Sequence, residues 1–228
     1  MVVYYPGDRI SMKTDAELQQ DVMNELKWEP TIKAAEIGVA VKDGVVTLSG
    51  YVDSYAQKLA AERAAARVFG VRALAEALRV RLPGSLRRSD EDIAGAAANA
   101  LQWNALMPSD HVNVKVQDGV VTLSGQVEWG YQKDIAEEEV CYLKGVVYVR
   151  NQITVKPKVK PLYVKAKIKS AFERNTMLDP RRITVKTIGS KVILSGIARS
   201  WIERAEAQWA AWAAPGVSEV DNNIIISP

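Results

Sequence analysis

The sequence predicts an α+β fold made of three tandem units, each a three-stranded sheet covered on one face by two helices. The run Val-Val-Thr-Leu-Ser-Gly occurs at 45–50 and again at 120–125, and a shorter form, Val-Ile-Leu-Ser-Gly, occurs at 192–196. A second glycine follows the glycine of each run by 20 residues. Constant spacing in three copies is the signature of an internal repeat, so the 228 residues are one small unit used three times.

The first helix of the first copy is predicted from residue 15 to about residue 29. Its apolar residues recur at helical spacing: Leu18, Val22 and Leu26. Asp15 is the expected N-cap, and Pro30 stops the helix.

A hairpin is predicted next. Apolar residues alternate over 37–41 as in a strand, and 45–48 returns as the second strand. The Asp43-Gly44 pair between them is typical of a tight turn with positive φ at both residues.

An alanine-rich helix and a third strand complete the unit. Ser54 opens this helix, Gly70 ends it, and 74–80 forms the strand. The order is therefore α-β-β-α-β.

The second and third copies repeat this order. In the third copy Ile188-Gly189-Ser190-Lys191 replaces the Asp-Gly turn, and we expect its hairpin to be one residue longer, at 187–191. Eight glycines are expected at turns and helix ends: Gly44, Gly50, Gly70, Gly119, Gly125, Gly145, Gly196 and Gly216.

The expected domain boundaries follow from the repeat. Residues 1–14 form an N-terminal extension, with Met12 as an alternative start. The units span 15–82, 90–155 and 162–227. The connecting segments are short, and the second contains two prolines, so we expect the units to be held in a defined arrangement.

The second copy carries a resemblance to a known family. Its helix is followed by V-x-V-x-D-G-V-V-T-L-S-G-x-V over 114–127, by Gly145-Val146 after the second helix, and by V-x-N-x-I-x-V over 149–155. This pattern resembles the BON domain. The resemblance implies a bacterial module that binds phospholipid or envelope components, a family that includes osmotically induced periplasmic stress proteins. This chain departs from it in the third hairpin and in lacking an export signal.

The composition and the N-terminal sequence limit which cellular compartment and which partners are expected. The N-terminus has no basic start followed by an unbroken apolar stretch, and a single cysteine, Cys141, excludes an intrachain disulfide. We expect a cytoplasmic protein, or a periplasmic one if a leader has been removed. A net charge of only +3 and the lack of a DNA- or RNA-reading motif argue against nucleic acid.

The charge is unevenly distributed along the chain. Residues 1–89 carry +2, 90–155 carry −6 and 156–228 carry +7. One interpretation is that the three segments form solvated surfaces whose net charges have diverged without a functional reason. The other is that the acidic middle segment and the basic end segment bind each other or an anionic partner.

Catalytic chemistry is not indicated. His111 has no nucleophile at a spacing typical of a catalytic pair, and one Cys with one His cannot form a zinc site. Cys141 aligns with Ala66 and Trp212, off the alanine-rich face, so we expect it to be at most partly exposed and unactivated. We expect no enzyme activity, no cofactor and no metal.

Two charged segments are candidates for surfaces. The acidic run 137–139 fans around its helix and is expected to be solvated. Lysines flank the apolar stripe of the helix that begins the third unit: Lys165, Lys167 and Lys169. They are either ordinary lysines around a core-facing stripe or a basic helix for an anionic membrane.

Three of the six tryptophans fall in the second helix of the third unit: Trp201, Trp209 and Trp212. The helical periodicity places them away from the inward alanines, and Trp209 aligns with Arg63 and Glu138. We expect an outward aromatic surface that meets a neighbouring unit, a second chain or lipid.

These observations predict a binding protein. The first hypothesis is association with anionic phospholipid surfaces or an envelope- or stress-linked assembly, through the lysines and tryptophans of the third unit. The alternative is a cytoplasmic protein–protein scaffold that self-associates as a homo-oligomer and binds no lipid.

Overall fold

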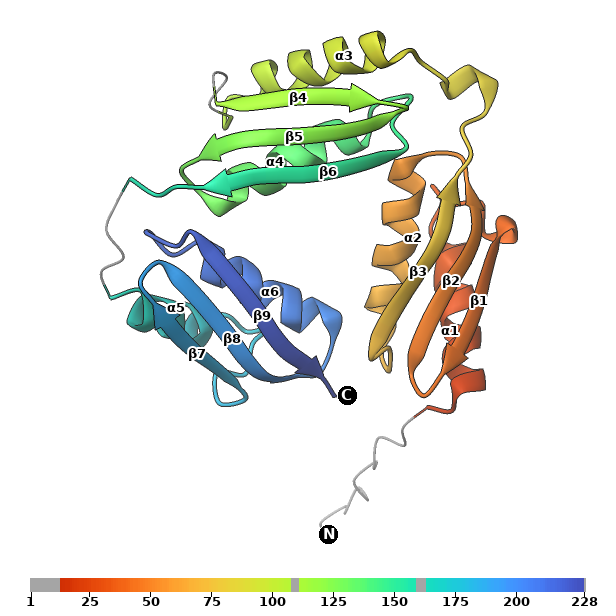
Figure 1. The fold of residues 1–228 in the computed structure, drawn as a ribbon. Coiled ribbons are helices and arrows are strands. Elements are labelled where there is room, and N and C mark those ends of the chain that lie inside the picture. Colours follow the sequence, from red (N-terminus) through yellow and green to blue (C-terminus); the bar gives the residue numbers. More distant parts are fainter. Residues whose placement is uncertain (1–12, 108–110, 159–162, 228) are drawn as a thin grey trace.

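The computed structural model describes residues 13–107, 111–158 and 163–227 (Figure 1). Most of the N-terminal extension predicted at 1–14 therefore lies outside the described residues. Unit 1 contains α1 (Asp15–Trp28), β1 (Ile37–Lys42), β2 (Val45–Val52), α2 (Tyr55–Arg67) and β3 (Ala73–Val80). Unit 2 contains α3 (Asp90–Trp103), β4 (Val112–Gln117), β5 (Val120–Val127), α4 (Gly130–Cys141) and β6 (Tyr148–Val155). Unit 3 contains α5 (Val164–Arg174), β7 (Ile183–Ile188), β8 (Lys191–Ala198), α6 (Trp201–Trp212) and β9 (Glu219–Ile226). The predicted fold class and element order are confirmed.

Each sheet has the hairpin's second strand in its centre. In unit 1, β2 pairs antiparallel with β1 and parallel with β3, and the other two units have the same order. A parallel pair needs a crossover connection, and the second helix of each unit supplies it. In unit 1 the buried residues of both helices form one core cluster with those of β2, so both helices lie on one face of the sheet.

The core of each unit lies between its helices and its sheet. In unit 1 the helical stripe Leu18, Val22 and Leu26 is buried, as the periodicity predicts. It packs with alternate residues of β2, of which Val46 and Leu48 are fully buried. The opposite face of the sheet is turned to solvent.

The start of α1 differs from the expectation. Thr14, not Asp15, is the N-cap: its Oγ1 accepts a hydrogen bond from the Glu17 amide, and the Glu17 carboxylate accepts one from the Thr14 amide. The Asp15 carboxylate instead accepts hydrogen bonds from the amides of Asp43 and Gly44, at 2.8 and 3.0 Å. Asp15 therefore ties the first helix to the hairpin turn.

The hairpin turns have the expected backbone in the first two units. Asp43 and Gly44 have φ of 52° and 74°, and Asp118 and Gly119 have 51° and 74°, as a type I′ turn requires.

The expectation of a longer third hairpin is wrong. Ile188 pairs with Lys191 across a two-residue turn, as Lys42 pairs with Val45 in unit 1. Positive φ occurs at Gly189 (59°) alone, which is the pattern of a type II′ turn. The type of turn changed, and its length did not.

Glycines end the second helix of each unit, as predicted. Gly70, Gly145 and Gly216 have φ of 104°, 93° and 90° in equivalent places. In the central strands Gly50, Gly125 and Gly196 also have positive φ, and a Cβ at each would collide with a carbonyl oxygen of the preceding segment, so only glycine fits there.

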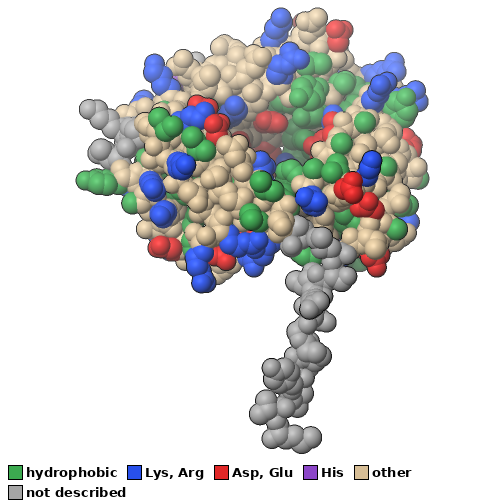
Figure 2. All heavy atoms as spheres, turned by 60° about the horizontal axis from the view of Figure 1, so that its bottom comes forward, with side chains coloured by type: hydrophobic (Ala, Val, Ile, Leu, Met, Phe, Trp, Pro, Cys, Tyr) green, Lys and Arg blue, Asp and Glu red, His purple; other side chains and the backbone are tan. Residues whose placement is uncertain are grey.

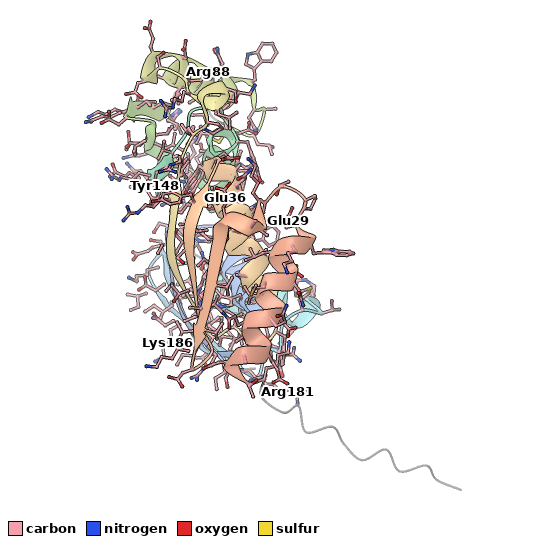
Figure 3. The ribbon with its side chains drawn as sticks, turned by 90° about the vertical axis from the view of Figure 1, so that its right-hand side faces the viewer. Glu29, Glu36, Arg88, Tyr148, Arg181 and Lys186 are labelled. Atoms are coloured by element: carbon pink, nitrogen blue, oxygen red, sulfur yellow. The ribbon has the colours of Figure 1, made fainter. Side chains whose placement is uncertain are left out.

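The three units surround a common centre, with α2, α4 and α6 turned toward it (Figure 1). Contacts between α2 and α6 join unit 1 to unit 3 directly. Seen from the side, Tyr148 lies where unit 2 meets unit 1, whereas Arg181 and Lys186 lie at the end of unit 3 away from unit 2 (Figure 3). Over the described ranges, no helix has both the length and the apolar character to cross a bilayer.

Candidate functional site

The helix α5 differs from its counterparts in charge. Its charged residues are three lysines, Arg174 and Glu173, for a sum of +3. The equivalent helix α1 has four acidic residues and one lysine, and α3 has three acidic residues and no basic one, so each sums to −3. Unit 3 therefore presents a cationic helix where its sister units present anionic ones.

The lysines of α5 are free to meet a partner. Val164, Ile168 and Phe172 are buried in the core of unit 3, while Lys165, Lys167 and Lys169 are exposed. Among the described residues, none of the three lies within 4.0 Å of a carboxylate oxygen. We call these three lysines the α5 surface.

The helix α6 packs beside α5 in unit 3. Asn175, at the end of α5, donates a hydrogen bond to Glu206 of α6, 2.8 Å away. Helical spacing places Lys165 and Lys169 on one flank of α5 and Lys167 on the other. The outward side between the two flanks carries Ala166, Ser170 and Glu173.

The three tryptophans of α6 do not form one exposed surface. Trp209 is 59% exposed. Trp201 packs against the core of unit 1, and Trp212 packs against the core of its own unit and lies over Gly130 of unit 2. The expectation of a single outward aromatic face is therefore corrected to one exposed tryptophan and two at contacts between units.

The contacts between units use aligned positions. The first residues of α2, α4 and α6 are Tyr55, Gly130 and Trp201. Tyr55 is 4% exposed, belongs to the core cluster of unit 2, and meets Tyr148 edge to face at 5.6 Å. Each of the three positions thus lies against a different neighbouring unit.

A second aligned set lies near the ends of the same helices. Trp212 lies against Gly130, Ala66 lines the same cavity as Trp201, and Cys141 shares a buried cluster with Tyr55. A large residue at one position thus accompanies a small residue at the other. The three units form a closed ring, and each interface pairs a large residue of one aligned set with a small residue of the other.

Cys141 is buried, in agreement with the expectation that it is at most partly exposed. Its residue surface is 1% exposed, because unit 1 covers this side of α4 and places Tyr55 in the same cluster. Burial raises the pKa of the thiol from 9.0 to about 11, so the thiol is protonated at neutral pH.

The acidic run of α4 is only partly solvated. Glu138 is exposed, but Glu139 is half-buried and accepts a hydrogen bond from Asn104 at 2.7 Å. Glu137 is half-buried and lines a cavity at the centre of the ring. His111 is exposed, and within the described ranges no group of three potential ligands is placed to hold a metal ion.

Two exposed tryptophans went unnoticed in the sequence. Trp28 ends α1 and Trp103 ends α3, and they are 84% and 86% exposed. The repeat itself contains the signal, because the two residues align with each other and with Arg174.

Family comparison decides the classification. The model of the family described as BON domain matches residues 14–81, 89–157 and 163–228. The chain belongs to the BON domain family. The three BON units are thus one family module in tandem, and the closed ring is the arrangement that this BON protein gives them.

A related BON protein has also been described. Osmotically-inducible protein Y of Escherichia coli (strain K12) is 35% identical over 148 residues, which cover 62% of this chain and 73% of that protein. Among solved structures, two of CdsD, a structural protein of the type III secretion system of Chlamydia trachomatis, are 12% and 13% identical and cover 92% and 95% of this chain, and 91% and 100% of theirs. Both have a TM-score of 0.26, so neither carries an argument about this chain.

Proposed function

We propose that this BON protein is a non-enzymatic binding protein that associates with anionic phospholipid surfaces through the α5 surface. The observation that carries the proposal is the reversal of charge on α5, from −3 in the two sister helices to +3. The relative named for osmotic induction supports a role in a stress response. The cytoplasmic location expected from the sequence stays a prediction.

The geometry suits a flat anionic partner. Lys165 and Lys169 lie on one flank of α5 and Lys167 lies on the other, and they border an outward side whose one acidic residue is Glu173. Each lysine near an anionic bilayer contributes about 1 kcal/mol, and salt weakens that attraction within a Debye length. Trp209, which is exposed on the neighbouring helix α6, adds an interfacial aromatic contact that salt affects little.

A second function, a self-associating protein scaffold, is favoured by a different observation. Trp28 and Trp103 are almost fully exposed at the same place in units 1 and 2. Exposed aromatic residues of this kind are typical of protein interfaces.

Liposome co-sedimentation tests the first function. We expect the full chain to sediment with anionic liposomes at low salt, less at high salt, and not with neutral liposomes. Lys165→Glu with Lys169→Glu should weaken binding at least tenfold, because two lysines account for about 2 kcal/mol.

The matched control reverses two exposed lysines of unit 2, Lys115→Glu with Lys144→Glu, for the same change in net charge. Equal weakening by both pairs would show a nonspecific charge effect and contradict the proposal. Absence of sedimentation at low salt, together with a mass by light scattering that rises with concentration, would favour the scaffold.

A further inference from the structure

The outer face of the sheet in unit 2, which is turned away from α4, carries two cationic side chains in one row (Figure 1). Lys115 of β4 pairs with Thr122 of β5, and Thr122 pairs with Arg150 of β6. The preceding residues of β5 and β6, Val121 and Val149, are buried under the helices, so the row points to solvent. Neighbouring strands lie about 4.8 Å apart, so the two cations flank the threonine with roughly 10 Å between their Cα atoms.

A shallow cavity of about 300 Å³ opens over this row. A cavity of this size is at the lower end of the range that holds small molecules. It lies wholly within unit 2, so it does not depend on how the three units are arranged. The lining offers hydrogen-bond donors from all three strands, at Lys115, Gln117, Thr122 and Arg150, and Asp118 and Val120 complete it.

Neither cation of the row is neutralised within the described part of the chain. No described carboxylate has an oxygen within 4.0 Å of Lys115 or Arg150. The two neighbouring rows on this face of the sheet are uncharged, so they supply no counter-ion either. One row contains Gln117, Val120 and Tyr148, and the other contains Asn113, Ser124 and Gln152.

Exposed cations are common on this protein, so their presence alone does not mark a site. Figure 2 shows Lys and Arg side chains scattered among acidic and hydrophobic ones over the face that it draws. Of the three aligned rows, that of unit 2 alone holds two cations around a hydroxyl, although residues 90–155 carry a net charge of −6. The corresponding row is Ala40, Thr47 and Ala75 in unit 1, and Lys186, Ile193 and Asp221 in unit 3.

The one acidic group of the lining has a separate reason to be there. Asp118 is the first residue of the hairpin turn, with φ of 51°, and unit 1 has Asp43 at the same place with 52°, although its row carries no cation. The carboxylate leaves the lining, with its two cations, at a net charge of +1. Since Asn-Gly suits the same turn, Asp118→Asn removes this negative charge and keeps the backbone.

We propose that this cavity of unit 2 binds the phosphate group of a small phosphomonoester, between Lys115 and Arg150 and over the Thr122 hydroxyl. A guanidinium donates two parallel hydrogen bonds to a phosphate, and an ammonium and a hydroxyl supply further donors. The three free oxygens of a phosphomonoester can accept from all of them, whereas a carboxylate has only two oxygens. The site is independent of lipid binding, because it lies in unit 2 and the α5 surface lies in unit 3.

Titration with glycerol 3-phosphate, followed by amide NMR on the full chain, tests this. We expect saturable shifts at Thr122 and Arg150, none with glycerol, and at least tenfold weaker binding of acetate. Lys115→Ala with Arg150→Ala gives unit 2 the row with which unit 1 already folds, and should weaken binding at least tenfold. Asp118→Asn should strengthen it.

The reverse transfer tests whether the row is sufficient. Ala40→Lys with Ala75→Arg places the row of unit 2 in unit 1, and should produce a second set of saturable shifts, at Thr47. The matched control, Lys42→Ala with Lys186→Ala, removes two exposed cations from the sheets of units 1 and 3 and should leave the affinity unchanged. Circular dichroism confirms that each variant is folded.

The liposome control separates this proposal from lipid binding. Lys115→Glu with Lys144→Glu should lose glycerol 3-phosphate binding and still sediment with anionic liposomes. Loss of sedimentation in that pair would assign the cavity to lipid headgroups and overturn the proposal. Equal affinity for acetate, an unchanged affinity in Lys115→Ala with Arg150→Ala, an equal loss in the matched control, or no saturable shift at Thr122 would each overturn it as well.

Discussion

Trp212 of unit 3 lies over Gly130 of unit 2, so closely that a Cβ on Gly130 would stand 2.5 Å from Trp212 Cε3. In the other two units the position of Gly130 is held by Tyr55 and Trp201, and the position of Trp212 by Cys141 and Ala66. The absence of a side chain at Gly130 is thus the condition for the indole to close the ring. One BON sequence has been adapted in three ways so that three copies fit one another.

Gly130→Ala should therefore destabilise the protein by about 1–3 kcal/mol, the usual cost of overpacking. Trp212→Ala should relieve it, with a coupling of at least about 1 kcal/mol in a double-mutant cycle measured by urea unfolding. Small-angle scattering should show a more open ring in Gly130→Ala. Additive effects of the two substitutions would contradict the contact.

Gly125→Ala should be far more damaging, by more than about 3 kcal/mol. Its φ is 131°, and a Cβ there would collide with the carbonyl oxygen of His111. The control is Gly95→Ala in α3, where nothing lies within 4 Å; removing a helical glycine should raise stability by about 0.5–1 kcal/mol. Thermal melting of both variants checks the sign.

Asp90→Ala should cost about 2 kcal/mol, since its carboxylate accepts hydrogen bonds from the amides of Asp118 and Gly119 at 2.8 and 2.9 Å. Asp92→Ala removes an acidic residue from the same helical turn without breaking such bonds, and should cost less than about 1 kcal/mol. Chemical denaturation distinguishes them, and equal losses would contradict the role of Asp90.

Glu62→Gln should raise the melting temperature at pH 7. The pKa of the folded carboxyl is raised, so the folded state is favoured while Glu62 is protonated and loses that advantage as pH rises through the folded pKa. The gain should therefore vanish near pH 3.5, below the ordinary value of 4.5, where the carboxyl is protonated in both states. Glu138→Gln serves as the control, and a lower melting temperature for Glu62→Gln at pH 7 would be the contrary result.

Cys141 should resist thiol reagents at neutral pH, because it is 1% exposed and its thiol pKa is about 11. Tyr55→Ala should accelerate its labelling at least tenfold by uncovering the contact of units 1 and 2, whereas Tyr131→Ala, at an exposed tyrosine of α4, should not. Above pH 9.0 the folded protein should lose stability as pH rises toward 11, since only the unfolded thiol then ionises readily. Rapid labelling of the unmodified protein would contradict the burial.

Much of the candidate site followed from local patterns. The lysines of α5 flank an apolar stripe of period 3.6, so their exposure was predictable from spacing, and the Asp-Gly turns were predictable from their residue types. The length of the third hairpin does not follow from the residue types, because Gly189 forms a two-residue turn of another type in place of the Asp-Gly turn. Trp28 and Trp103 were overlooked although the repeat aligns them.

The sequence by itself determined the α-β-β-α-β unit, its threefold repetition and the glycines that shape it, because periodicity and steric demands act over a few neighbouring residues. Only the tertiary structure decided that Asp15 serves the hairpin and not its own helix, that Cys141 is buried, and that Trp201 and Trp212 face other units. The partners of those residues are distant in sequence. Their environment arises when three separately folded surfaces pack together, and no local pattern records which surfaces will meet.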